Sequence, residues 1–108
     1  MKLLFAIIQT EDEKVLTREL VEHSFSVTRV ATSGGFLKSG NATLMIGVEK
    51  DCLEDALRII KEKSHRRKSL MAAPPFPTHG VEHAPIPIEV NVGGATVFVV
   101  DVEQFHKY

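Results

Sequence analysis

The feature that most constrains the fold is a nearly unbroken apolar run at the start of the chain, which reads KLLFAIIQ over residues 2–9. A strand is apolar at almost every position only when both of its faces are covered. The run is also far shorter than the ~20 residues that a helix needs to span a bilayer. The sequence therefore predicts a central strand, covered on both faces by its own chain or on one face by a neighbouring subunit.

Two helices are predicted from capping boxes followed by apolar residues at helical spacing. Residues 10–13 read TEDE and residues 51–54 read DCLE, so that each pair of first and fourth side chains could bond to the first helical turn. The first helix should be amphipathic and should end near His23. The second has the cleaner stripe, because residues 53, 56, 57 and 60 are all apolar.

The remaining regular segments read as strands. Residues 25–33 and 42–48 flank a glycine-rich loop, residues 86–92 alternate apolar and polar side chains, and residues 95–102 are hydrophobic. The order is strand, helix, strand, strand, helix, strand, strand. It predicts an α+β protein with a ferredoxin-like βαββαβ fold and one extra C-terminal strand.

The loop at residues 34–41 reads GGFLKSGN and is the first candidate for a binding site. Glycines let the backbone approach a small anionic ligand closely, although they also suit a plain hairpin connection. Exposed apolar side chains at a loop tip are costly. Phe36 and Leu37 are therefore expected to close over something, either the flat face of a base or the core of their own or a neighbouring subunit.

A second long loop is predicted at residues 69–85, because five prolines lie between Pro74 and Pro87 and proline resists helix and central strand. Its His79 and His83 have no nearby cysteine, so a pair of solvent-facing histidines is a simpler interpretation than a metal site, and no metal is expected. The basic residues 61–68 just before it face the carbonyl end of a helix, which favours cations without any nucleic acid.

Composition and motifs exclude several functional classes. The 108 residues suit one domain, and 13 basic against 14 acidic residues give a net charge of -1, which does not fit a polynucleotide-binding protein. The single cysteine forms no internal disulfide, and without a signal peptide we expect a cytoplasmic location and no membrane association. Asn41 and Ala42 stand where a P-loop needs Lys and Ser or Thr, and no catalytic triad signature is present, so we expect no enzyme.

Residues 30–48, VATSGGFLKSGNATLMIGV, together with residues 92–108, VGGATVFVVDVEQFHKY, resemble the PII-like cyclic di-AMP receptor family, often called PstA or DarA. The resemblance implies a homotrimer of single PII-like domains, spanning residues 1–108, that binds cyclic di-AMP at each subunit interface without catalysis and without a cofactor. The loop at 34–41 would correspond to a shortened T-loop. The loop at 69–85 would correspond to an enlarged B-loop, which would signal to a downstream protein.

The resemblance also assigns ligand-binding roles. The polar members would bond to a phosphate or a base edge, the glycines would allow close backbone approach, and the aromatic and apolar members would pack on an adenine or line the site. These residues are Thr28, Gly35, Phe36, Leu37, Asn41, Gly47 and Phe98.

The chain departs from the family pattern at polar positions. The pattern has Asn and Arg where this chain has Ser24 and Ser26, and Gln where it has Lys107. Replacing Arg by Ser removes a charge-assisted hydrogen bond, which contributes ~1.5 to 3 kcal/mol. Arg29, Lys38 or Lys107 could compensate for that lost charge. The alternatives left open are a family member for another adenine nucleotide, a ligand-independent adaptor, and an enzyme or metal-tolerance protein that uses the two loop histidines.

Overall fold

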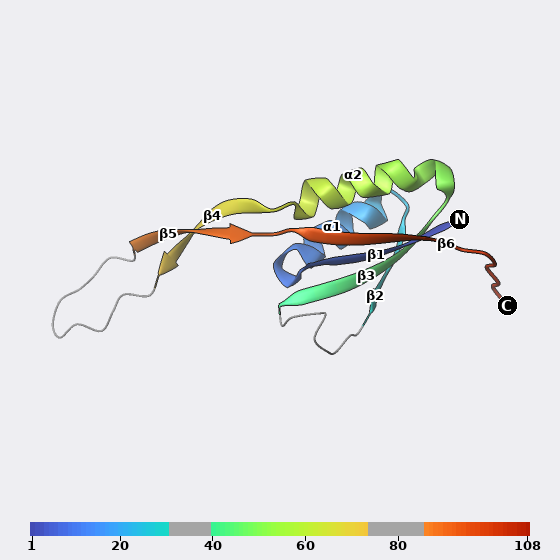
Figure 1. Ribbon diagram of the computed structural model, residues 1–108, viewed down its shortest axis with the longest axis horizontal. Coiled ribbons are helices and arrows are strands. Elements are labelled where there is room, and N and C mark those ends of the chain that lie inside the picture. Colours follow the sequence, from blue (N-terminus) through green and yellow to red (C-terminus); the bar gives the residue numbers. More distant parts are fainter. Residues whose placement is uncertain (31–39, 74–85) are drawn as a thin grey trace.

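The computed structural model describes residues 1–30, 40–73 and 86–108, and Figure 1 shows a compact body from which a hairpin extends. The body comprises β1 (Lys2–Gln9), α1 (Thr10–Glu22), β2 (Ser26–Val30), β3 (Asn41–Val48), the 3-10 turn η1 (Lys50–Cys52), α2 (Leu53–Ser64) and β6 (Ala95–Asp101). The hairpin comprises β4 (Arg67–Ala73) and β5 (Ile86–Val92).

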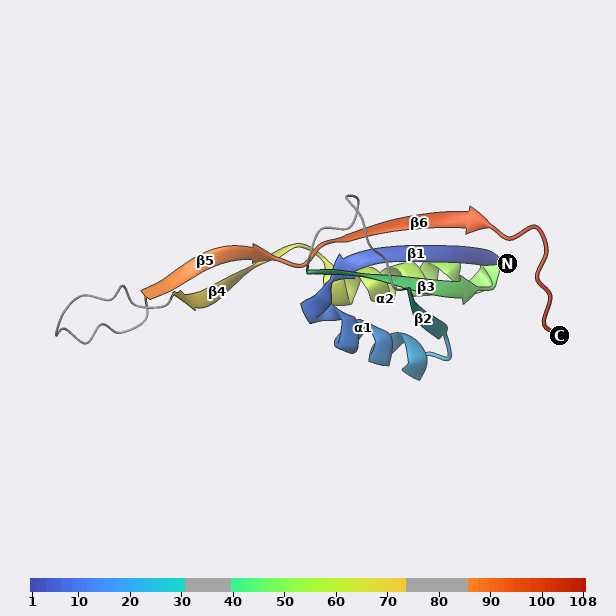
Figure 2. The ribbon, with the colours of Figure 1, turned by 90° about the horizontal axis from the view of Figure 1, so that it is seen from below.

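The body has the predicted ferredoxin-like arrangement. Its strands form an antiparallel sheet in the order β2-β3-β1-β6, with β1 in an interior position as its apolar sequence predicts. Both helices lie on one side of this sheet (Figures 1 and 2). Among the described residues, no helix has the length and apolar character needed to cross a membrane.

The two faces of β1 are covered to different degrees. Leu4, Ala6 and Ile8 point toward the helices and are at most 1% exposed, packed with residues such as Leu16 and Ile60. The alternate side chains of β1, at positions 3, 5 and 7, point to the side without helices and are only partly buried. We call that side the open face. The chain itself therefore covers one face of its central strand fully and the other only in part.

The predicted loop at residues 69–85 begins too early, because residues 69–73 lie in β4. Strand β4 pairs antiparallel with β5 from Arg67 opposite Val92 to Ala73 opposite Ile86. The sequence RKSLMAA lacks β-branched residues and directly follows a basic helix end, so cross-strand pairing, which local pattern does not reveal, decides its structure. The fourth strand of the body sheet is β6, and the strand predicted at 86–92 belongs to the hairpin outside that sheet.

The predicted capping boxes do not form, although the helices do. Gln9 caps α1 and Cys52 caps α2, and neither makes a side-chain cap bond. Thr10 is already helical and Asp51 lies within η1, so neither side chain occupies the capping position. The C-terminal end of α1 is close to the predicted one. Ser24 adopts φ 68, and the N–H groups of Ser24 and Phe25 donate to the carbonyls of Val21 and Leu20 at 2.9 Å each, which is a Schellman cap.

Candidate functional site

Two of the predicted ligand residues lie in one row across the open face. The strand register aligns Thr28 of β2 with Met45 of β3, Met45 with Phe5 of β1, and Phe5 with Phe98 of β6. Thr28 is exposed and Phe98 is 46% exposed. The row therefore presents a hydroxyl, a thioether and two aromatic rings on the side away from the helices.

Gly47 lies in the next row of the same face, between Ser26 and Leu3. A side-chain carbon added at Gly47 would meet no atom within 4 Å, so the surface at this position is open to a close approach. Ser24, Ser26 and Gly47 line one hollow with a volume of about 320 Å³. The two positions at which the chain departs from the family pattern before β2 are thus neighbours of a predicted ligand residue.

Asn41 lies at the opposite end of β3, opposite Gln9 of β1. The preceding Gly40 has φ 95, and its carbonyl accepts a 2.8 Å hydrogen bond from the N–H of Thr10. This bond ties the end of the glycine loop to the start of α1. The predicted loop residues Gly35, Phe36, Leu37 and Lys38 lie outside the described residues, as do His79 and His83.

The structure directs one proposed charge donor, Arg29, away from the open face. Arg29 points to the helix side of the sheet, where its Nε lies 3.3 Å from Oε1 of Glu13. Lys107 is exposed in the segment that follows β6. The guanidinium of Arg29 is therefore not on the face that carries Thr28 and Gly47.

The open face also holds a buried hydroxyl. Thr43 is 6% exposed, and its Oγ1 has no hydrogen-bond partner among the described residues. The register places Thr43 between Val30 and Ile7, two positions along the strand from Met45. A buried hydroxyl without a partner is destabilising, so a donor or acceptor supplied from outside these residues would be favourable there.

Sequence reasoning missed the polar bonds that hold the hairpin to the body, which we call the junction. Both Nη atoms of Arg67 donate to the carboxylate of Asp12, at 2.7 and 3.3 Å, and Nη1 also donates to the carbonyl of His65. The backbone N–H of Gly93 donates to Gln9 Oε1 at 2.7 Å, and that of Gly94 donates to the carbonyl of Ser64. Arg67 was hidden in a basic run assigned to a helix end.

Asp12 is the charge on which the junction depends. Its side chain is 7% exposed in the first turn of α1, while that of Arg67 is 39% exposed. Hydrogen bonding to Asp12 raises the pKa of the Arg67 guanidinium above its usual value, so the cation is present throughout the accessible pH range.

Within the described residues no group of three or more His, Cys, Asp or Glu side chains gathers as a metal site would require.

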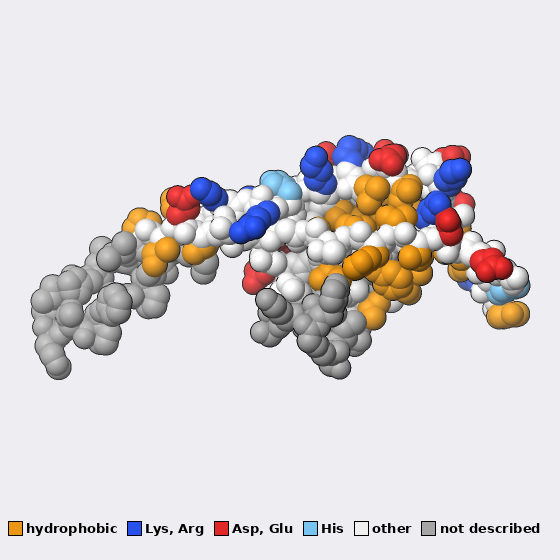
Figure 3. Space-filling model, in the orientation of Figure 1, with side chains coloured by type: hydrophobic (Ala, Val, Ile, Leu, Met, Phe, Trp, Pro, Cys, Tyr) orange, Lys and Arg blue, Asp and Glu red, His pale blue; other side chains and the backbone are white. Residues whose placement is uncertain are grey.

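The edge strand β6 carries exposed apolar side chains. Figure 3 shows hydrophobic side chains on both sides of the β6 backbone, and Phe98, Val99 and Val100 are between 41% and 46% exposed. An exposed apolar edge strand and a partly covered sheet face are surfaces that proteins normally cover with a partner. The fold is thus a ferredoxin-like module whose sheet presents apolar surface.

The chain belongs to the cyclic-di-AMP receptor family, whose model matches residues 1–108, the whole chain. It is also similar to a solved structure, described as the crystal structure of a functionally unknown protein from Pediococcus pentosaceus ATCC 25745. The two sequences are 40% identical, the alignment covers 99% of this chain and 96% of the other, and the TM-score is 0.80. The family membership and the fold predicted from the sequence are thereby confirmed.

Proposed function

We propose that this protein is a non-enzymatic signal receptor that binds cyclic di-AMP at clefts between subunits. The observation that carries the proposal is the common placement of Thr28, Gly47 and Phe98 on one open, largely apolar sheet face in a chain that matches the receptor family throughout. A face of this kind offers flat apolar contacts for adenine rings and a hydroxyl for a polar group of the ligand.

The clefts would form when the open face and the β6 edge are covered by other copies of the chain in a homotrimer. The partly buried β1 side chains and the exposed apolar side chains of β6 support this assembly, because their burial between subunits would be favourable. The glycine loop at 34–41 would close over the ligand. The segment at 69–85, including its β4 residues, would relay the bound state to a downstream protein.

Calorimetric titration with cyclic di-AMP tests the ligand assignment, and light scattering tests the trimer. Thr28→Ala removes a hydroxyl from the open face with little loss of packing, and one lost hydrogen bond to a charged group should weaken binding roughly tenfold. Thr17→Ala, on α1 behind the sheet, is the matched control and should leave affinity unchanged. Absence of heat at high micromolar cyclic di-AMP would remove the ligand assignment, and a monomer in solution would remove the interface site.

A second candidate is a family member that binds another adenine nucleotide or acts as an adaptor without a ligand. The hollow lined by Ser24, Ser26 and Gly47 favours it, since the family pattern has an arginine at one of these serines. Thermal shift with a panel of adenine nucleotides separates the cases, because a ligand that binds only the folded state raises the melting temperature. Ser26→Arg should strengthen cyclic di-AMP binding if the missing charge is what limits it.

A further inference from the structure

A groove with a volume of about 760 Å³ lies at the end of the sheet remote from Ser26, where the C-terminal end of α2 meets the Gly93–Gly94 turn. Its apolar part is formed by Leu57 and Val97, which are both partly exposed. Its polar rim includes Lys61 and His65 from the end of α2 and Arg66 from the link to β4. We call this feature the basic groove. Its volume is within the range of ~300 to 1,000 Å³ typical of small-molecule sites.

The charges around the groove are divided unequally. The described residues that line it include three basic side chains and no Asp or Glu. Two of the neighbouring cations are paired elsewhere, since Arg67 pairs with Asp12 and Lys68 lies 3.2 Å from Glu89. Lys61 and Arg66 have no ion pair with any residue that the structure describes. Two cations without an ion pair therefore line the groove, while Lys63 of the same helix end does not line it.

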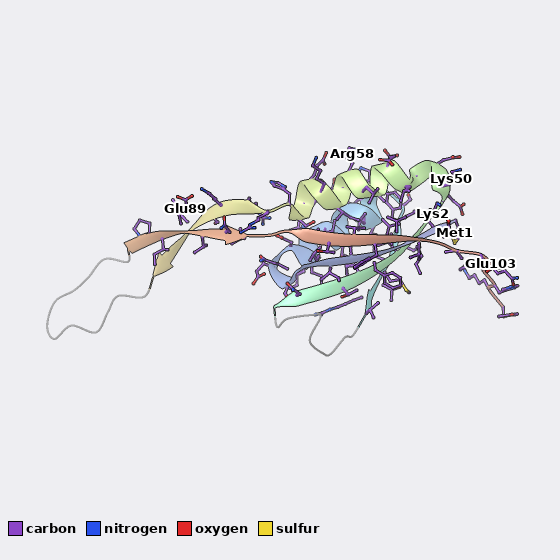
Figure 4. All side chains as sticks on the ribbon, in the orientation of Figure 1. Met1, Lys2, Lys50, Arg58, Glu89 and Glu103 are labelled. Carbon is purple, nitrogen blue, oxygen red and sulfur yellow. The ribbon has the colours of Figure 1, made fainter. Side chains whose placement is uncertain are left out.

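The three consecutive cations at the start of the hairpin point to different places. Arg67 and Lys68 open β4 and therefore point to opposite faces of the strand, whereas Arg66 precedes it. Arg67 turns toward α1, Lys68 toward β5, and Arg66 lines the groove. Figure 4 places Arg58 on the outer surface of α2 and Glu89 out on the hairpin, and Arg58 pairs there with Asp55 and Glu62 at 3.7 and 3.5 Å.

The polar groups of the rim suit an anion better than a cation. The Nδ1–H of His65 donates to the carbonyl of Lys61 at 3.0 Å, so this ring is held at the end of α2 and the anion-binding groups of the rim are the two cations. The backbone N–H groups of Gly93 and Gly94 are already used in the junction, so they fix the wall of the groove rather than bind a ligand. Binding would thus depend on the guanidinium of Arg66 and the ammonium of Lys61, the two groups that commonly bind phosphate oxygens.

We propose that the basic groove is a second binding site, which takes the phosphate group of a small molecule against Lys61 and Arg66 and an apolar or ring portion against Leu57 and Val97. The site is distinct from the row at Thr28, because Leu57 and Val97 belong to the helix side of the sheet and the row lies on the open face. Asn41 lines it as well, which places it at the base of the glycine loop. The phosphate belongs either to cyclic di-AMP or to a separate phosphorylated metabolite.

Calorimetric titration with inorganic pyrophosphate at low ionic strength tests the site itself. The full-length protein should bind it, and the double variant Lys61→Gln with Arg66→Gln should bind at least tenfold more weakly. The matched control is Lys14→Gln with Arg18→Gln, which removes the same charge from the exposed outer side of α1 and should change affinity less than twofold. Both positions in the test variant are exposed, and thermal melting of each variant checks that the fold is retained.

Absence of pyrophosphate binding at millimolar concentration would overturn the proposal, as would an equal loss in the control. Cyclic di-AMP titrated into the same two variants identifies the source of the phosphate. A parallel loss in the Lys61 and Arg66 variant assigns the dinucleotide's own phosphate to the groove, and unchanged dinucleotide affinity assigns a separate metabolite. A wild-type protein that ignores cyclic di-AMP would sink the proposed receptor function and leave the pyrophosphate result standing.

Discussion

The body and the hairpin of this protein are held together by different kinds of interaction. The body buries Leu4, Leu44, Ile46 and their neighbours at 0% to 1% exposure between a sheet and two helices. The hairpin has only β4 and β5, and it presents Leu70 at 71% exposure. A two-stranded hairpin alone is marginally stable in water. Its position therefore depends on the polar junction, whereas the body is stabilised mainly by apolar burial.

The largest expected effect comes from truncating matched leucines in the two regions. Leu44→Ala leaves a cavity in the core and should lower the free energy of unfolding by about 3 kcal/mol, whereas Leu70→Ala removes an exposed side chain and should change it by less than about 0.5 kcal/mol. Urea denaturation at one fixed protein concentration measures both. A cost for Leu70→Ala similar to that for Leu44→Ala would mean that the hairpin is covered in solution, and the contrast between the regions would fail.

The next effect concerns the two glycines of the junction. Gly93 has φ 80, and a side-chain carbon there would collide with the His65 carbonyl and the Arg67 guanidinium, whereas Gly94 has φ 110 with open space around it. Gly93→Ala combines backbone strain with a collision and should cost about 2 to 3 kcal/mol, against about 1 kcal/mol for Gly94→Ala. Amide exchange should accelerate in β5 at Val90 before it does in β3. Equal acceleration in both strands would show that the hairpin is not a separate unit.

The ion pair of the junction should have an intermediate effect. Asp12→Asn removes the carboxylate that holds Arg67 and should cost about 1 to 2 kcal/mol, because solvent screens a guanidinium that is more than a third exposed. Asp55→Asn is the matched control, since Asp55 also lies in the first turn of a helix but pairs with Arg58 on the surface. Thermal unfolding compares the two variants. A control as destabilising as Asp12→Asn would point to the helix dipole instead of the junction.

The same contrast explains how much of the structure the sequence could predict. The body was accessible because its apolar periods are local: residues 2–9 require a central strand, and the stripe at residues 53–60 requires a helix. The segment at 67–73 was not accessible, because its strand exists only through pairing with residues 86–92. Likewise, no local pattern shows that Arg67 bonds to Asp12, 55 positions away in the sequence.

The candidate site also has a part that the sequence could predict and a part that it could not. Alternation in β2, β3 and β6 could have placed Thr28, Gly47 and Phe98 on one face, since each lies an even number of positions from its open-face neighbours. The residue type of Arg29 does not show whether its side chain lies on the ligand face or on the helix side of the sheet. Its neighbour Thr28 points to the open face, while Arg29 itself points to Glu13 on α1. The basic groove required the tertiary structure, because the end of α2 and the link after it line it together with the Gly93–Gly94 turn and the ends of β1 and β3.

The smallest expected effect compares one cross-strand ion pair in each region. Lys2 of β1 bonds to Asp101 of β6 in the body, and this bond lowers the pKa of the Asp101 carboxyl below its usual value. Its stabilising effect is therefore present above the pKa of the unfolded chain, near 4, and is lost as the pH falls through the folded-state pKa. Lys2→Gln should raise the pKa of Asp101 in a carboxyl-carbon NMR titration and should flatten the acid side of the stability profile slightly.

Lys68→Gln is the control, because it breaks the pair with Glu89 in the hairpin. It should leave the pKa of Asp101 unchanged, because Lys68 is not among the cations that lower this pKa. A shift of Asp101 in that control would show that the hairpin communicates electrostatically with the far edge of the body.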